Sequence, residues 1–85
     1  MTGLTYQAVH QSLRRTRGRA SEHACISCGG KAQEWAYDHE DPHEVQVVHR
    51  GRLVAISADL AHYEPRCCEC HRYYDLAVIE TSALA

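Results

Sequence analysis

The sequence lacks the features that would direct the chain into a membrane or out of the cell. It also lacks the excess of basic residues found in proteins that coat nucleic acid. It has no apolar run long enough to span a bilayer and no charged-then-apolar leader at Met1. We therefore expect a cytoplasmic protein that makes no membrane contact. The formal charge of −2 is not the strong positive excess that histone-like binding of nucleic acid requires.

The chain is also short, and it has no internal repeat, low-complexity tract or linker that would divide it. Its 85 residues predict a single small domain over 1–85. A chain of this length buries too little apolar surface to be stable without an additional cross-link. The sequence must therefore supply such a cross-link.

Two cysteine pairs can supply it, in Cys25-Ile26-Ser27-Cys28 and Cys67-Cys68-Glu69-Cys70. Paired Cys-x-x-Cys turns are typical of a closed tetrahedral zinc site. Cys68 with Cys70 would form a shorter, poorer chelate, so we expect Cys68 to be a free, partly buried thiol. The alternative is two disulfides or idle core thiols, but reduced thiols fit a cytoplasmic protein. Zinc binding would contribute on the order of 10 kcal/mol to folding.

An N-terminal helix is predicted over 5–17, where Thr5 can cap the first turn and Gly18 follows the last. Its apolar stripe is narrow and must lie on the zinc core. Three arginines occupy its last turn, where they either form a solvated helix end or contact phosphate. These are Arg14, Arg15 and Arg17.

The middle of the chain reads as short strands. Cys28-Gly29-Gly30 is typical of a zinc knuckle, and alternating side chains predict a strand over 34–38. Two β-prone runs, 45–48 and 53–56, are either a hairpin or one strand with a long loop. Residues 57–63 suggest a helical turn capped by Ser57 and ended by Pro65.

A second helix is predicted from Glu69 to about Ile79, because apolar residues recur at helical spacing, and we expect 82–85 to fray. The chain therefore reads as a small α+β domain. It combines a zinc knuckle, strands and a helix that begins with the second cysteine pair.

Three motifs occur in a fixed order: Cys25-x-x-Cys28-Gly29, Trp35-x-Tyr37-Asp38-His39 and Arg66-Cys67-x-x-Cys70-His71. Over about residues 20–75 this order resembles the zinc-containing HNH endonucleases, including recombination endonuclease VII. It is also similar to small HNH-type proteins of phages that infect actinobacteria. The resemblance implies a zinc-stapled treble clef carrying a ββα-metal hairpin and helix over 25–75, here with an extra N-terminal helix.

The resemblance also implies a metal-dependent DNA endonuclease. Asp38 and His71 would bind a catalytic Mg²⁺ or Mn²⁺, and His39 would take a proton from the attacking water. His62 stands where the family usually has an asparagine that fixes the loop of the base. DNA phosphates would be held by arginines, which bind them in a two-pronged way. The candidates are Arg14, Arg15, Arg17, Arg66 and Arg72.

A different function remains open on the same fold. Asp38 could cap a turn, His39 could be one more solvated histidine, His71 could shield the zinc thiolates and His62 could pack on the core. The family's frequent helix lysine is replaced by Tyr73-Tyr74-Asp75. A catalytically degenerate zinc module that binds a host protein or DNA, as a monomer or homodimer, would show such changes.

Overall fold

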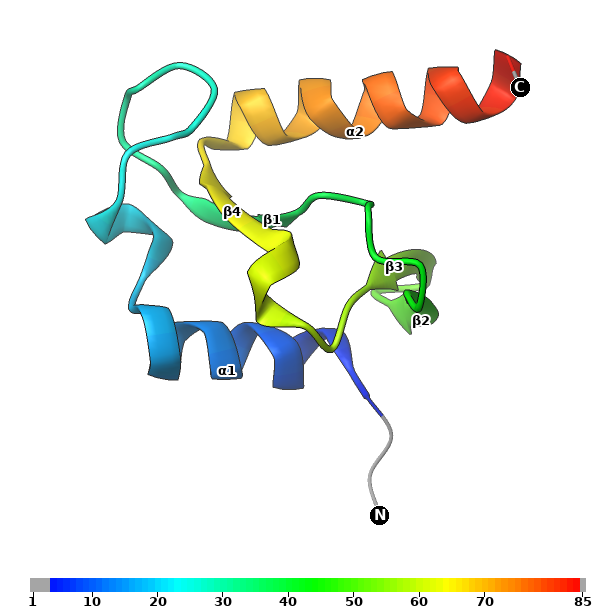
Figure 1. Ribbon diagram of the computed structural model, residues 1–85, viewed down its shortest axis with the longest axis horizontal. Coiled ribbons are helices and arrows are strands. Elements are labelled where there is room, and N and C mark those ends of the chain that lie inside the picture. Colours follow the sequence, from blue (N-terminus) through cyan, green and yellow to red (C-terminus); the bar gives the residue numbers. More distant parts are fainter. Residues whose placement is uncertain (1–3, 85) are drawn as a thin grey trace.

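The computed structural model describes residues 4–84, with side chains described as far as Val78 (Figure 1). The described chain is a small α+β structure with two helices and two small antiparallel sheets, as expected from the sequence. In Figure 1, α1 and α2 lie on opposite sides, with β1 and β4 between them. The elements run α1(Tyr6–Arg17), η1(Ala20–Glu22), β1(Glu34–Tyr37), β2(Val45–His49), β3(Arg52–Ile56), η2(Leu60–His62), β4(Tyr63–Arg66) and α2(Cys68–Leu84).

Helix α1 confirms the predicted caps. The Thr5 hydroxyl accepts a hydrogen bond from the Ala8 amide at 3.0 Å, which satisfies one of the free donors of the first turn. Gly18 ends the helix with a φ of 84°, a left-handed conformation that favours glycine. Val9 and Leu13, one turn apart, are the buried face of the helix.

Strand β1 pairs with β4, and this pairing was not predicted. Trp35 lies opposite Pro65, and Tyr37 lies opposite Tyr63. Pro65 was expected to end a helical turn, but it lies inside β4. A proline is tolerated there because both strands of a two-stranded sheet are edges. The Pro65 carbonyl instead accepts a hydrogen bond from the Ile26 amide at 3.0 Å, which ties β4 to the cysteine knuckle.

The segment between β1 and β4 contains the second sheet. Of the two alternatives left open, the structure has the hairpin: β2 pairs with β3, with Val47 opposite Val54. The short η2 follows, and its cap is Asp59, whose carboxylate accepts from the Ala61 amide, rather than the expected Ser57. Ser57 is fully buried instead, where its amide donates to the Tyr63 hydroxyl at 3.1 Å.

Helix α2 begins at Cys68 and continues to Leu84, beyond the predicted end at Ile79. Ala85 lies outside the described residues. Within those residues, no helix has both the length and the apolar character needed to cross a membrane.

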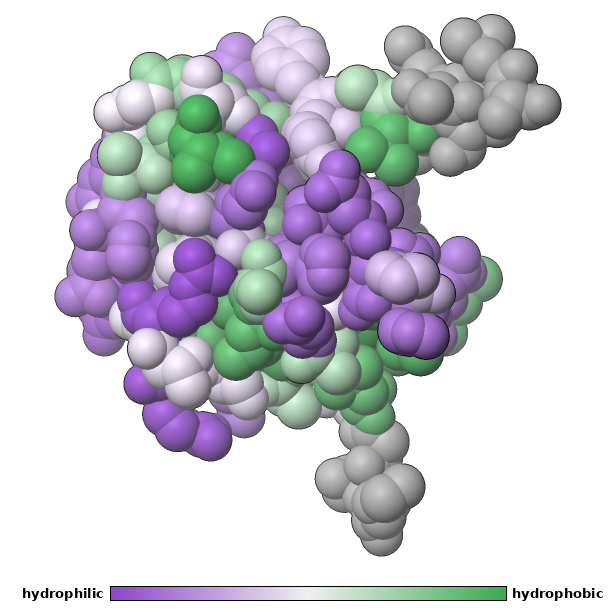
Figure 2. Space-filling view, in the orientation of Figure 1, coloured by the Kyte–Doolittle hydropathy of each residue, from purple (hydrophilic) through white to green (hydrophobic). Residues whose placement is uncertain are grey.

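One small hydrophobic core joins α1, the knuckle and both sheets. Its members are buried residues from segments far apart in the sequence: Val9, Leu13, Ala20, Cys25, Ala32, Trp35, Tyr37, Ile56 and Tyr63. On the face seen in Figure 2, hydrophobic residues form small separate patches among hydrophilic ones. The core is thin, as expected for a chain of this length.

Candidate metal centre and histidine cluster

Four cysteine side chains converge between the knuckle and the start of α2. The sulfurs of Cys25, Cys28, Cys67 and Cys70 all lie within 4.8 Å of one another. The Cys28 and Cys67 sulfurs are 3.9 Å apart. That is too long for a disulfide, but it is close to the edge of about 3.8 Å of a tetrahedron with zinc–sulfur bonds of about 2.3 Å. The cluster therefore fits a metal ion such as zinc.

Within the cluster, the pKa values of two thiols are shifted in opposite directions. The backbone amides of Cys67, Cys28 and Ser27 lower the pKa of the Cys25 thiol to about 6, against the effect of its burial. Hydrogen bonding to Cys67, with burial and the other thiols, raises the pKa of Cys70 to about 12. Thiolates this close repel one another, so all four ionise together only around a cation.

Cys68 is the cysteine left out of the cluster, as predicted. It was expected to be partly buried, but it is exposed. Cys68 is the first residue of α2, where its amide donates to the Gln33 side chain at 2.9 Å.

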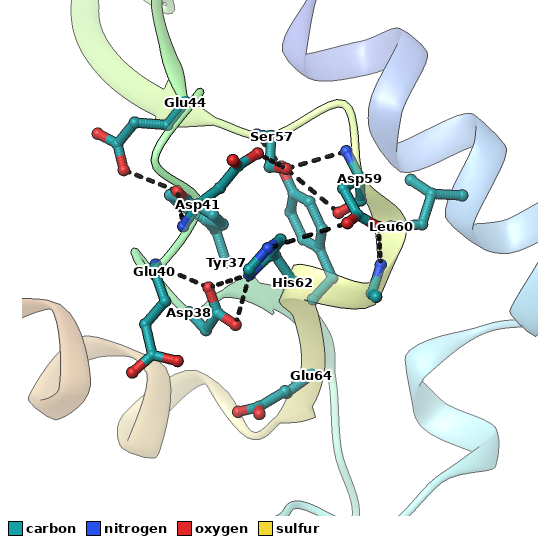
Figure 3. Close-up of polar contacts among 12 residues, drawn as sticks. Tyr37, Asp38, Glu40, Asp41, Glu44, Ser57, Asp59, Leu60, His62 and Glu64 are labelled. Carbon is teal, nitrogen blue, oxygen red and sulfur yellow. Dashed lines mark hydrogen bonds and ion pairs between the residues drawn. The ribbon is translucent and has the colours of Figure 1, made fainter.

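Asp38, directly after β1, and His62, the last residue of η2, face each other (Figure 3). The His62 Nδ1 lies 3.0 Å from both carboxylate oxygens of Asp38. The Asp38 amide donates to the His62 carbonyl at 2.8 Å, so backbone and side chains join the same two residues. The hydrogen bond with Asp38 raises the pKa of His62, although burial opposes this. His62 therefore fixes Asp38, the residue between β1 and His39.

His39 lies beside α2 rather than in solvent. Its Nε2 is 3.0 Å from one carboxylate oxygen of Asp75, and the other oxygen is 3.3 Å from the Nε2 of His71. Burial alone would raise the pKa of Asp75, but hydrogen bonds from His39 and His71 bring it below its ordinary value. His71 in turn contacts Glu34 at 2.8 Å. A continuous series of contacts thus runs from Glu34 to His39.

None of the sequence motifs identifies Asp75 as a site residue. The available signal was its spacing: Asp75 follows His71 by four residues, so the two share one face of a helix. That spacing alone does not show that the same face meets the end of β1. The partner of Asp75 there, His39, is far away in the sequence.

The predicted metal pair of Asp38 and His71 has no direct contact in the described structure. Helix α2 runs along β1, so His71 reaches Glu34 at the start of the strand. One turn later, the Tyr74 hydroxyl donates to the Asp38 carbonyl at 2.5 Å. The four cysteines are the only group of three or more potential metal ligands among the described side chains.

Two of the five predicted phosphate-binding arginines hold the fold together. Arg17 donates to the Leu60 and Tyr63 carbonyls at 3.1 and 2.7 Å, and its guanidinium lies 4.4 Å from the centre of the Trp35 ring. These contacts fasten α1 to η2, β4 and β1.

Arg66 is 7% exposed. It donates to the Ser27 hydroxyl and to Glu64, and its guanidinium stacks over the Tyr74 ring at 4.2 Å. Arg14, Arg15 and Arg72 are exposed. The buried Arg66 side chain therefore connects the knuckle, β4 and α2. The other three arginines face solvent.

The comparison with known proteins gives no match. No family model, curated protein or solved structure is similar to the chain. The function of the chain is therefore inferred from its own residues and their geometry.

Proposed function

We propose that the chain is a metal-dependent DNA endonuclease of the HNH type, with His39 as its general base. The observation that carries the proposal is the contact of His39 with Asp75, at the point where β1 ends beside α2. Strand β4, which pairs with β1, leads directly into α2, and the four cysteines bring the start of that helix beside the knuckle. This order supports a treble clef with a ββα unit.

The contact with Asp75 defines the chemistry available to His39. A carboxylate accepts the Nε2 proton of a neutral imidazole, so Nδ1 retains its lone pair and can take a proton from water. His39 has a φ of 62°, a strained conformation for a residue other than glycine. The backbone of the preceding Asp38 holds it there, because its amide and carbonyl are bonded to His62 and Tyr74.

Among the described side chains, no group of three or more potential ligands surrounds Asp38, and His71 is not beside it. A Mg²⁺ or Mn²⁺ ion would therefore be held by the Asp38 carboxylate together with water and DNA phosphate oxygens, because these hard cations prefer oxygen ligands and take few of them from the protein. Such an ion supplies neutralisation of phosphate charge and stabilisation of the leaving oxygen. His39 and Asp75 handle the proton of the attacking water.

A nicking assay tests the proposal. Zinc-loaded protein is incubated with supercoiled plasmid and with branched DNA in added Mg²⁺ or Mn²⁺. His39→Ala should lower the rate about 10²-fold or more, because a general base contributes about 10²- to 10⁴-fold. The matched control is His43→Ala, an exposed histidine of the same acidic loop. Zinc content must be equal in both variants. Equal nicking by His39→Ala and wild type contradicts the proposal.

A second candidate function, binding of a host protein without turnover, is favoured by one feature of the β2–β3 hairpin. Val48 and Leu53 are cross-strand partners, yet they are 71% and 68% exposed. Paired apolar side chains in water are typical of a contact surface. If no divalent metal gives nicking above the His39→Ala level, this module replaces the nuclease. Val48→Ser should then abolish capture of the partner.

A further inference from the structure

A cleft of about 890 Å³ lies between α1, the start of β1 and the tip of the β2–β3 hairpin. Its volume is in the upper part of the range of about 300–1,000 Å³ for ligand pockets. None of the zinc ligands and none of Asp38, His39 and His62 line it. Its lining includes Tyr6, His10, Arg14, Arg19, His49 and Arg50.

The charge of the cleft is opposite to that of the chain. Three arginines, Arg14, Arg19 and Arg50, line it with a single carboxylate, Glu34, whereas the whole chain has a formal charge of −2. Glu34 is already paired with His71 at 2.8 Å. In the described part of the chain, no hydrogen bond or ion pair engages the three guanidinium groups. They therefore remain available to an anionic ligand.

One wall of the cleft is a stack of three flat rings. Tyr6 lies between His10 and His49, with ring centres 4.2 and 4.0 Å apart. Burial, with help from Arg14, lowers the pKa of His10 to about 4, so this ring is neutral at pH 7. The stack fastens the hairpin to α1 and gives the cleft a rigid wall beside its arginines.

We propose that this cleft binds the phosphodiester backbone of a single DNA strand. Guanidinium groups bind phosphates in a two-pronged way, and a positively charged groove follows the backbone of a single strand without reading its sequence. The volume accommodates a few nucleotides rather than a duplex. This inference rests on the proposed nuclease function and names the form of its substrate. Glu34 connects the cleft to the proposed catalytic histidine. It lines the cleft and contacts His71, which contacts Asp75, and Asp75 in turn contacts His39.

The salt dependence of single-strand binding tests the proposal. Each phosphate neutralised on a single strand contributes about −0.7 to the slope of log K against log salt. Three arginines predict a slope of about −2, so affinity should fall about 20-fold between 50 and 200 mM salt. Arg14→Gln, Arg19→Gln or Arg50→Gln should each reduce that fall to about 7-fold. Lys31→Gln, an exposed cation outside the cleft, should leave it unchanged.

The experiment uses zinc-loaded protein carrying His39→Ala, with no added divalent metal, and follows the anisotropy of a fluorescent oligothymidine. Binding is thus measured without cleavage, so a failed cleft and a failed nuclease are distinguishable. Tighter binding of the single strand than of a matched duplex supports the inference. Equal slopes in all four variants overturn it. So does equal binding of an oligoglutamate peptide, or binding of inorganic phosphate alone.

Discussion

Acid should weaken the fold in a way that depends on His10. Its pKa is about 4 in the folded chain, against an ordinary value of 6.5. Because the folded pKa is the lower one, the unfolded chain binds the proton first, and stability falls as the pH decreases through 6.5 toward 4. The full effect, reached below pH 4, is about 3 kcal/mol. Between pH 7 and 5.5 the linkage relation gives a loss of about 1 kcal/mol.

The groups that face His10 come from four elements. Arg14 on α1, His71 on α2 and His49 on β2 disfavour its protonated form, while Glu34 on β1 favours it. His10→Gln keeps a polar side chain in the stack but removes the titration. The variant should therefore lose about 1 kcal/mol less than wild type over the same pH range.

Urea unfolding followed by circular dichroism at steps from pH 7 to 5.5 gives the free energy of unfolding of both proteins. Metal content is checked at each step, because cysteine ligands also take up protons in acid. His62 titrates in the opposite sense, since its pKa is raised, but it does so equally in both proteins. Parallel curves for wild type and His10→Gln would refute the burial of a neutral His10.

The remaining predictions concern the metal centre, the general base and the buried arginine. Cys28→Ser should prevent stable folding, whereas Cys68→Ser should keep one zinc per chain, as measured by metal analysis. A wild-type protein that is folded but contains no zinc would contradict the proposed metal centre. Asp75→Asn should lower the kcat of nicking about tenfold or more at unchanged KM and zinc content, because His39 loses its orienting carboxylate; a change in KM alone would contradict this role. Arg66→Gln should lower the free energy of unfolding by about 2 kcal/mol in urea, since it breaks buried hydrogen bonds and a stacking contact. An effect under about 0.5 kcal/mol would mean that Arg66 does not brace the core.

The parts of the fold that could be predicted from the sequence are governed by local chemistry. Thr5 and Gly18 bound α1 because caps satisfy backbone groups within a few residues. The four cysteines of the cluster could be chosen because a Cys-x-x-Cys turn restricts which sulfurs meet. Neither inference needed knowledge of how distant segments pack.

The parts that could not be predicted are long-range. Pro65 looked like a stop signal, although an edge strand accepts it, so the β1–β4 pairing was missed. The direction of α2 along β1 decides that Asp75, not Asp38, meets His71, and no local pattern encodes that direction. Arg14 and Arg50 line one cleft only because the Tyr6–His49 stack brings the hairpin onto α1.

The pairing of β1 with β4 has a consequence for how the chain can diversify. Tyr37 and Tyr63 close the base of the inserted segment, with rings 5.6 Å apart, and the β2–β3 hairpin lies entirely beyond that closure. Doubling the length of such a loop costs only about 0.6 kcal/mol. The hairpin bears Arg50 but none of the residues that hold His39. Its length can therefore vary without altering the contacts that hold His39 between β1 and α2.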